Sequence, residues 1–270
     1  MMPSSFENLF DIKGKTALVT GGSRGIGEMI AAGFLAKGAR VYISSRKAAA
    51  CDEAAKRLSD TYGMECVSLP ADLSQVSGAE SLASRLAERE PKLDILVNNA
   101  GVAWGASIDT FPEVGWDKVM DTNVKGVFFV TQKLLPLLRN AAAQGSPARV
   151  INIGSVDGIK TATFDTFSYG ASKAAVHHLT RFLAVHLIKE NILVNAIAPG
   201  PFPTWMLSTG VGFRGETENV DWDSVGRANP SGRVGTAEDI AGLAIFLCSR
   251  AGEYIVGQTI ACDGGEVAAS

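Results

Sequence analysis

Tyr169 and Lys173 are the pair of residues in this sequence whose types and spacing best suit proton transfer. Positions four apart on a helix lie one turn above each other on the same face. An ammonium group beside a phenol favours the phenolate, so it lowers the pKa of the tyrosine towards working pH. We therefore interpret Tyr169 as a candidate acid and base. The same spacing also arises by chance on helix surfaces, so its meaning depends on the rest of the chain.

A glycine-rich segment near the N-terminus predicts a phosphate-binding turn. The apolar run Thr16–Thr20 leads into Gly21, Gly25 and Gly27, and a helical pattern follows. Glycines at these positions permit a tight turn, a close approach of the backbone to a pyrophosphate, and close packing of helix on strand. The helix N-terminus adds unpaired N–H groups and a positive dipole end. Together these features predict nucleotide binding.

The same segment also fits a different reaction class, serine hydrolysis. Gly21, Ser23 and Gly25 match the G-x-S-x-G turn that carries the nucleophile of α/β-hydrolases. Such an enzyme needs a histidine late in the chain, beyond its acidic residue. The three histidines of the chain all fall within one predicted helix, and they are His177, His178 and His186. The hydrolase interpretation is therefore disfavoured.

The end of the second predicted strand bears on the choice of nucleotide. An NAD enzyme usually places Asp or Glu near this point, where it binds the ribose 2′-hydroxyl. This chain has Ser45 and Arg46 instead. Arg46 and Arg24 could hold a 2′-phosphate by charge-assisted hydrogen bonds, although both would also suit a solvated surface. The sequence favours NADP(H) over NAD(H).

Alternating strand and helix patterns must position these residues. Short runs rich in β-branched residues are typical of strands buried on both faces. These runs are Thr16–Thr20, Arg40–Ser44, Glu65–Leu69, Leu93–Val97, Arg149–Ile153, Leu193–Ile197 and a last one, Thr259–Ala261. Helical periodicity covers Gly27–Lys37, Ala48–Tyr62, Gly78–Arg89, Val114–Leu138, Ala171–Glu190 and Ala237–Cys248. The alternation predicts an α/β fold, a Rossmann-type doubly wound parallel sheet of about seven strands with helices on both faces.

The chain shows no linker and no internal repeat. We therefore predict one dinucleotide-binding and catalytic domain over residues 1–270. One stretch breaks the alternation: Phe202–Pro230 mixes proline, glycine, tryptophan and charged residues with weak periodicity. This stretch predicts a mobile loop or helical flap over the substrate at about residues 202–230.

Composition argues against several other classes of protein. The net charge is −3 with no block of like charge, which disfavours a nucleic-acid surface or an electrostatic membrane patch. No apolar run approaches the ~20 residues of a membrane span, and Met1 to Asp11 lack the pattern of a signal peptide. The four cysteines lie far apart and suit reduced thiols rather than a metal cluster. We expect a cytoplasmic protein that binds no metal, membrane or nucleic acid.

Several further motifs follow in a characteristic order. They are Thr20-Gly21-x3-Gly25-Ile26-Gly27, Asp72-Leu73, Asn98-Asn99-Ala100-Gly101, Asn123, Ser155, Tyr169-x3-Lys173, Pro199-Gly200-x3-Thr204 and Asp263-Gly264-Gly265. With them the chain resembles the short-chain dehydrogenase/reductase family from Gly14 to Gly265. Within that family it most resembles bacterial NADPH-dependent 3-oxoacyl reductases of the rhamnolipid-pathway type, through residues 20–27, 134–139 and 148–155.

The resemblance implies a role for each of four catalytic residues. Tyr169 exchanges a proton with the substrate oxygen, and Lys173 lowers its pKa and holds the nicotinamide ribose hydroxyls. Ser155 hydrogen-bonds the carbonyl or developing alkoxide. Asn123 anchors a water that links Lys173 to solvent. Without the family resemblance, Ser155 could simply cap a turn and Asn123 could be a polar residue that interrupts a helix.

The resemblance and the glycine turn together assign a set of NADP(H)-binding residues. The set is Gly21, Ser23, Arg24, Gly25, Ile26, Gly27, Ser45, Arg46, Asp72, Leu73, Asn99, Ala100, Gly101, Tyr169, Lys173, Pro199, Gly200, Phe202 and Thr204. The resemblance places residues 72–73 at the adenine, 99–101 under the adenosine ribose, and 199–204 beside the nicotinamide. It implies that Asn98 braces neighbouring strands and that residues 263–265 form a turn near subunit contacts.

Two departures from the family pattern concern the substrate side. Ser155 and Tyr169 are fourteen positions apart, one more than the family leads us to expect, so the loop Gly158–Phe167 should bulge. Asp157 stands where small or apolar residues are more usual. A turn carboxylate facing solvent is the simpler interpretation. The alternative is an acid inside the pocket that binds a hydroxyl or amine.

Apolar and aromatic residues of the flap favour a bulky carbonyl substrate. They are Trp205, Met206, Leu207, Val211, Phe213 and Trp222, with Trp104 at another edge, although some could simply pack the flap on the body. A carrier protein would need a basic patch, and Arg214, Arg227 and Arg233 are offset by nearby acids. We expect reduction of a 3-oxoacyl group or hydrophobic ketone to a secondary alcohol.

Two alternative functions and an oligomeric state also follow from the sequence. The first alternative to a ketone reductase is an NADP-linked dehydrogenase of a polyol, sugar acid or steroid-like alcohol. Another, from a different class, is an idle nucleotide sensor, against which the complete Asn-Ser-Tyr-Lys set argues. Family analogy and the apolar helices Val114–Leu138 and Ala171–Glu190 predict a homotetramer, with a dimer as the second choice.

Overall fold

The computed structural model describes residues 6–143, 146–162, 164–211 and 220–270. Its centre is one parallel sheet of seven strands in the order β3-β2-β1-β4-β5-β6-β7. The strands are β1 Thr16–Thr20, β2 Arg40–Ser44, β3 Cys66–Ser68, β4 Ile95–Asn98, β5 Ala148–Ile153, β6 Ile192–Pro199 and β7 Thr259–Cys262. The predicted doubly wound fold and each of its strands are confirmed, with ends that differ by at most two residues.

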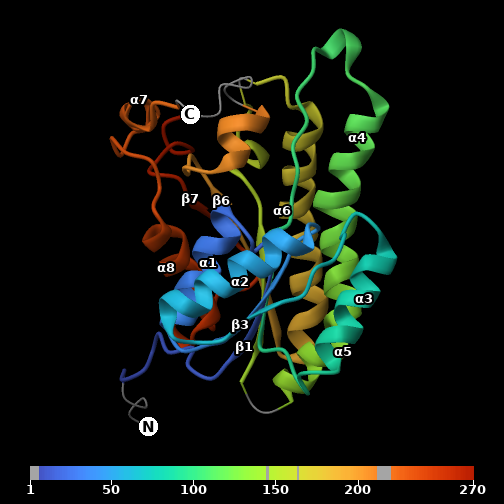
Figure 1. Ribbon diagram of the computed structural model, residues 1–270. Coiled ribbons are helices and arrows are strands. Elements are labelled where there is room, and N and C mark those ends of the chain that lie inside the picture. The colour runs from blue at the N-terminus through green and yellow to red at the C-terminus, as the bar shows by residue number, and fades with distance from the viewer. Residues whose placement is uncertain (1–5, 144–145, 163, 212–219) are drawn as a thin grey trace.

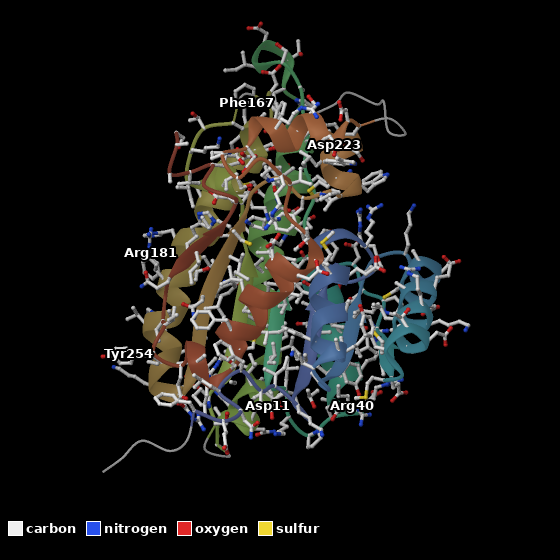
Figure 2. The ribbon with its side chains drawn as sticks, turned by 90° about the vertical axis from the view of Figure 1, so that its left-hand side faces the viewer. Asp11, Arg40, Phe167, Arg181, Asp223 and Tyr254 are labelled. Atoms are coloured by element: carbon white, nitrogen blue, oxygen red, sulfur yellow. The ribbon has the colours of Figure 1, made fainter. Side chains whose placement is uncertain are left out.

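Helices cover both faces of the sheet (Figures 1 and 2). They are α1 Gly25–Ala36, α2 Ala48–Tyr62, α3 Val76–Ala87, α4 Glu113–Met120, α5 Gly126–Ala142, α6 Phe167–Leu187, α7 Trp222–Ala228 and α8 Ala237–Cys248. Among the described helices, none combines the length and the apolarity that a membrane crossing requires.

Side-chain alternation along the strands explains why two hydrophobic cores form. In β1, Ala17 and Val19 pack into the core that includes Phe34 of α1, whereas Leu18 faces the opposite core with Leu134 of α5. Successive residues of a strand point to opposite faces. A strand in the middle of the sheet must therefore be apolar at most positions, and all eight residues of β6 are buried.

The order of the strands fixes where a ligand can bind. β1 pairs with β2 on one side and with β4 on the other, so the chain leaves β1 and β4 towards opposite edges of the sheet. At such a switch point the connections after the two strands diverge and open a crevice at their carboxyl ends. The segments that follow β1, β4, β5 and β6 all meet at this end of the sheet (Figure 1).

The predicted helix Val114–Leu138 is wrong as one regular helix. The structure has α4, then a wide helical turn at Asp121–Lys125, then α5. In the wide turn the N–H of Gly126 bonds the carbonyl of Asp121, five residues earlier. Such turns insert one residue into a helix and are frequent at functional sites. Here the insertion surrounds Asn123.

The helix boundaries also differ from the prediction by up to four residues, and the start of α6 matters most for the site. α6 begins at Phe167 rather than Ala171, so Tyr169 lies within its first turn. The flap at residues 202–230 contains a helical turn, Met206–Val211, and α7. The predicted flap residues Phe213 and Arg214 lie outside the described residues.

Candidate active site

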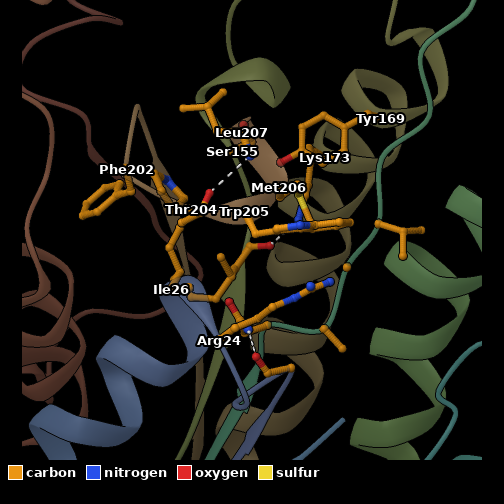
Figure 3. Close-up of a pocket in the computed structure, with 18 of the residues that line it drawn as sticks. Arg24, Ile26, Ser155, Tyr169, Lys173, Phe202, Thr204, Trp205, Met206 and Leu207 are labelled. Atoms are coloured by element: carbon orange, nitrogen blue, oxygen red, sulfur yellow. Dashed lines mark hydrogen bonds between the residues drawn. The ribbon is translucent and has the colours of Figure 1, made fainter. Parts of the chain in front are cut away.

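A cavity of about 710 Å³ opens at the carboxyl ends of the strands. Its walls come from the turn between β1 and α1, the segments after β2 and β4, the end of β5, the start of α6 and the flap. Figure 3 shows Ser155, Tyr169 and Lys173 at one end, and Arg24 with Ile26 at the other. The cavity thus joins the predicted catalytic residues to the predicted phosphate-binding turn.

Ser155, Tyr169 and Lys173 are brought together as the sequence predicted. Ser155 directly follows β5, is 7% exposed, and its Oγ accepts a hydrogen bond from the Asp157 N–H at 3.1 Å. The Lys173 Nζ lies 5.4 Å from the centre of the Tyr169 ring and donates to the Ile153 carbonyl at 2.8 Å. The phenol, the hydroxyl and the ammonium group therefore share one end of the cavity.

The predicted lowering of the Tyr169 pKa is wrong. Burial raises the pKa of Tyr169 to about 12, because a phenolate is poorly solvated there, and a hydrogen bond to Ser155 only partly offsets this. Burial also lowers the pKa of Lys173 to about 8, and the nearby Asp157 carboxylate opposes that shift. Tyr169 is therefore a neutral phenol at neutral pH, the form that can donate a proton.

Asn123 ties together the segments on either side of this group. Its Oδ1 accepts from the Val102 N–H at 2.9 Å, and its Nδ2 donates to the Val102 carbonyl at 2.9 Å and to the Ser172 Oγ at 3.0 Å. Ser172 in turn donates to the Tyr169 carbonyl at 2.7 Å. Asn123 does not line the cavity, so it acts on α6 and the segment after β4. Its predicted water stays a prediction.

The glycine turn has the shape of a cradle for a phosphate. Gly21 has a positive φ of 65°, and a Cβ there would lie 2.7 Å from the Asn99 Nδ2. A side chain at this position would therefore clash with the segment after β4. The α1 N-terminus follows directly, and its N-cap residue, Arg24, makes no side-chain cap hydrogen bond, so a phosphate could accept from the first N–H groups. The backbone fits a pyrophosphate, as predicted.

Gly27 has a different place from that of the other predicted cofactor residues. It is buried in α1 and does not line the cavity. A Cβ there would lie 2.4 Å from the Gly21 carbonyl oxygen. Gly27 lets the helix pack closely on the turn, which is the packing role of the third glycine. Every other residue of the predicted cofactor set lines the cavity.

Two arginines place positive charge at the phosphate end. Arg46 lines the cavity just beyond β2, and Arg24 lines it from the glycine turn. Burial, with a smaller contribution from the charge of Arg46, lowers the pKa of Arg24. The Arg24 guanidinium lies 4.0 Å from the centre of the Trp205 ring, a cation–π contact that joins the turn to the flap (Figure 3). The donors fit a 2′-phosphate.

The middle of the cavity is lined by the segments after β3 and β4. The exposed Asp72 carboxylate accepts from the Ser74 N–H at 3.1 Å and from its hydroxyl at 2.8 Å. Asn99 directs its Nδ2 to the Thr20 and Gly21 carbonyls, so its side chain braces the glycine turn. Asn98 donates to Thr131 and Asn152, which confirms the prediction that it braces strands.

Residues 199–204 border the catalytic end, as predicted. Phe202 is 2% exposed and its ring packs on Gly235, so the backbone is what this residue can offer a ligand. Thr204 accepts from the Leu207 N–H at 3.3 Å and starts the first helical turn of the flap. Its methyl group lies against Gly25 of the glycine turn.

The simpler interpretation of Asp157, a turn carboxylate facing solvent, is wrong. Asp157 is half-buried and lines the cavity beside Ser155. Burial is the main cause that raises the pKa of its carboxyl, and the charge of Glu266 adds to it. Its acid group therefore belongs to the site.

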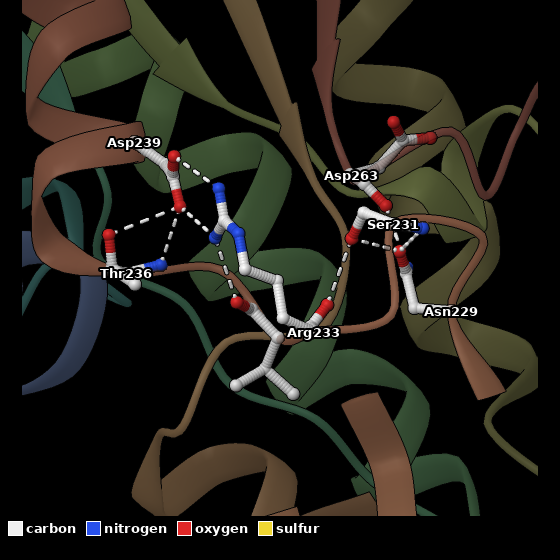
Figure 4. A network of polar contacts seen from close by, with 7 residues as sticks. Asn229, Ser231, Arg233, Thr236, Asp239 and Asp263 are labelled. Carbon is white, nitrogen blue, oxygen red and sulfur yellow. Dashed lines mark hydrogen bonds and ion pairs between the residues drawn. The ribbon is translucent and has the colours of Figure 1, made fainter. Parts of the chain in front are cut away.

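The C-terminal segment is held against the flap by a polar network (Figure 4). Asn229 donates to the Asp263 carbonyl at 2.8 Å and accepts from Ser231 at 2.7 Å. Arg233 pairs with Asp239 at 2.6 Å next to the start of α8. Residues 263–265 form the predicted turn, with Asp263 accepting from the Gly265 N–H at 3.0 Å. The network sets the position of Glu266, which lines the cavity.

Sequence reasoning missed several residues on the substrate side. Lys160 and Glu266 line the cavity and pair at 2.7 Å, and Phe164 also lines it. Val225 and Ala228 contribute from α7. Lys160 and Phe164 fall in the loop after Ser155, where the unusual length was the available signal. Among the described residues, no group of three or more His, Cys, Asp or Glu side chains is placed to hold a metal ion.

The fold and the site together define a nucleotide-dependent oxidoreductase. A family model described as enoyl-(acyl carrier protein) reductase matches residues 21–266. The chain belongs to the short-chain dehydrogenase/reductase family, as its motifs predicted. The match covers nearly the whole chain rather than one motif.

Two similar proteins carry names of different substrate classes. A 3-oxoacyl-acyl-carrier-protein reductase of rhamnolipid biosynthesis from Pseudomonas aeruginosa is 51% identical over 95% of this chain and 97% of its own. A 2-dehydro-3-deoxy-D-gluconate 5-dehydrogenase from Dickeya dadantii is 37% identical over 97% of this chain and 98% of its own. The solved NADP active-site complex of RhlG from Pseudomonas aeruginosa superposes with a TM-score of 0.89 at 49% identity, covering 97% of this chain and 99% of the other.

Proposed function

We propose that this chain is an NADPH-dependent carbonyl reductase that converts a 3-oxoacyl group or another bulky hydrophobic ketone into a secondary alcohol. The observation that carries the proposal is one cavity with Ser155, Tyr169 and Lys173 at one end and a glycine turn with two arginines at the other. The NADP complex of the similar RhlG structure supports the same cofactor. Arg46 and Arg24 are the residues that would hold its 2′-phosphate.

The residues of the catalytic end suit the reductive direction. A bound NADPH supplies the hydride to the carbonyl carbon. In this proposal Ser155 hydrogen-bonds the carbonyl oxygen, and the neutral Tyr169 phenol gives that oxygen its proton, so little alkoxide charge accumulates. Lys173 next to Tyr169 then stabilises the phenolate that proton donation leaves behind.

Part of the cavity lining suits an apolar substrate body. Phe164, Met206, Leu207 and Val225 are among the residues that line the cavity. Two of the arginines that could attract a carrier protein are paired with acids, Arg227 with Asp221 at 3.6 Å and Arg233 with Asp239. We therefore expect free ketones or thioesters to react without a carrier protein.

A second candidate is the NADP-linked oxidation of a polyol, a sugar acid or a steroid-like alcohol. The similar gluconate-type dehydrogenase and the carboxylate of Asp157 inside the cavity favour this candidate. It uses the same residues in the reverse direction, with Tyr169 as the proton acceptor.

A cofactor and substrate panel tests both candidates. We expect NADPH consumption with 3-oxoacyl thioesters or aryl and medium-chain ketones, and at least about tenfold weaker use of NADH. Turnover of alcohols alone, with NADP⁺, would favour the second candidate. Binding of NADPH without turnover of any carbonyl or alcohol would contradict both candidate functions and would favour a nucleotide sensor. Equal use of NADH would refute the role of Arg46.

We also propose a cytoplasmic homotetramer. The four cysteines are free thiols, which suits a reducing compartment. Exposed apolar side chains on the outer faces of the α4–α6 region include Trp116, Phe128, Phe182 and Val185. Contact between copies would cover them.

A further inference from the structure

One carboxylate in the catalytic cavity, that of Asp157, takes no part in the proton transfer described above. It sits in the short turn Val156–Gly158 that follows Ser155. The turn is fixed at both ends, because the Asp157 N–H bonds the Ser155 Oγ at 3.1 Å and the Gly158 N–H bonds the Ser155 carbonyl at 3.0 Å. Asp157 is therefore held at a constant position relative to the catalytic serine.

No described protein group uses the hydrogen-bonding capacity of the Asp157 carboxylate. Within the described part of the chain, no side chain or backbone N–H donates to it or forms an ion pair with it. Lys160, whose charge acts on Asp157, is engaged by Glu266 at 2.7 Å. Half-burying a carboxylate without a partner is costly, and burial raises the pKa of its carboxyl. A ligand that brings a donor would relieve this cost.

The cavity that contains Asp157 also has apolar lining residues. Phe164, Met206 and Leu207 contribute apolar groups to this lining, and Figure 3 shows Met206 and Leu207 at the catalytic end of the cavity. A carboxylate without a protein donor, in a cavity that is also partly apolar, selects for a ligand with a matching donor.

The charges around Asp157 indicate which kind of donor fits. Lys160 and Lys173 both act on Asp157 with positive charge, and Glu266 acts with negative charge. The two positive charges of the lysines balance the two negative charges of Asp157 and Glu266. The surroundings therefore give no net attraction for another cation. A neutral hydroxyl meets the carboxylate at a smaller desolvation cost than an ammonium group does.

We propose that Asp157 is a specificity-determining residue that accepts a hydrogen bond from a hydroxyl group on the substrate, close to the reacting carbon. The preferred substrate is then a hydroxyketone with an apolar body, or the corresponding diol in the oxidative direction. This inference rests on the proposed function and narrows its substrate class. A plain ketone still reacts, but it leaves the Asp157 carboxylate without its partner.

Matched pairs of ketones test this inference. Each pair shares one carbon skeleton and differs by a single hydroxyl on the carbon next to the carbonyl or on the following one. The readout is the ratio of kcat/KM within a pair, from initial rates of NADPH consumption. We expect the wild-type enzyme to prefer the hydroxylated partner by about 10- to 100-fold, the range for a hydrogen bond to a charged group.

Variants at position 157 separate recognition from other effects of the charge. Asp157→Asn and Asp157→Ala also change the surroundings of Tyr169 and Lys173, but such changes act equally on both members of a pair. We expect the ratio to fall to within about threefold of unity in Asp157→Ala and to an intermediate value in Asp157→Asn. Asp165→Asn is the matched control, since it removes one exposed charge from the same loop without touching the cavity, and it should keep the wild-type ratio.

The possible results discriminate this inference from the proposed function. Turnover of plain ketones with no preference for any hydroxylated partner would overturn the role of Asp157 and leave the reductase intact. A preference that survives in Asp157→Ala would do the same. Absence of NADPH consumption with every ketone and of NADP⁺ reduction with every diol would overturn the proposed function together with this inference.

Discussion

At the scale of single residues, Tyr169 and Lys173 influence each other's pKa less than their spacing suggests. The Lys173 Nζ gives a hydrogen bond to the Ile153 carbonyl, and burial dominates the pKa of both residues. The sequence predicted which residues meet but not the direction of the tyrosine shift. The spacing along a helix shows that two side chains lie close together. The loss of solvent around them depends on the segments that bury them, and those segments are distant in the sequence.

The pH dependence of the reaction follows from these two residues. We expect kcat/KM for ketone reduction to be flat below about pH 7 and to fall with a midpoint near 8, where Lys173 loses its proton. Tyr169, with a pKa of about 12, still holds its proton there. The measurement is kcat/KM against pH at saturating NADPH.

A single substitution checks the assignment of that midpoint to Lys173. The Asp157 carboxylate raises the Lys173 pKa, so Asp157→Asn should move the midpoint to lower pH. A midpoint that stays fixed or moves upward would show that another group titrates.

At the scale of elements, the glycine turn and the strands could be predicted because their signals are local. The wide turn at Asp121–Lys125 could not, since it depends on the reach of Asn123 to the backbone of Val102. The Lys160–Glu266 pair joins segments more than a hundred residues apart, and it too left no local pattern. Contacts between distant segments are set by the whole fold rather than by propensity.

The link between β5 and the turn that carries Ser155 depends on a close contact with α6. A Cβ at Gly154 would lie 2.0 Å from the Nε2 of His177, which is 6% exposed. Because the ring has little room to move, we expect Gly154→Ala to lower the free energy of unfolding by about 1–3 kcal/mol. It should also lower kcat through a displaced Ser155. Denaturant unfolding and steady-state rates measure the two effects.

A glycine with free space provides the control for this substitution. Gly242 lies exposed in α8, and among the described residues no atom beyond its chain neighbours and the local helix backbone comes within 4 Å of the point that an alanine methyl group would occupy there. Gly242→Ala should therefore stabilise the helix by about 0.4–1 kcal/mol. A Gly154→Ala protein as stable as the wild type would contradict the close packing of His177.

At the scale of the whole molecule, exposed apolar side chains on α6 support the proposed contact between copies. Phe182 and Val185 are 55% and 69% exposed on this long helix. We expect light scattering to give about four times the 28.3 kDa of one chain at micromolar concentration. Val185→Asp should shift the mass towards dimers or monomers. A monomeric wild-type protein would contradict the proposal.

The central proposal is that Tyr169 donates the proton in an NADPH-dependent ketone reduction. The most direct measurement compares NADPH consumption by wild type and Tyr169→Phe with one reactive ketone, beside a fluorescence titration of NADPH binding. Phe keeps the ring and removes only the hydroxyl, so the cavity stays filled. We expect turnover to fall by about 10²- to 10⁴-fold while the Kd for NADPH changes by less than about threefold. A Tyr169→Phe enzyme that retains more than about a tenth of wild-type turnover would contradict this role for Tyr169.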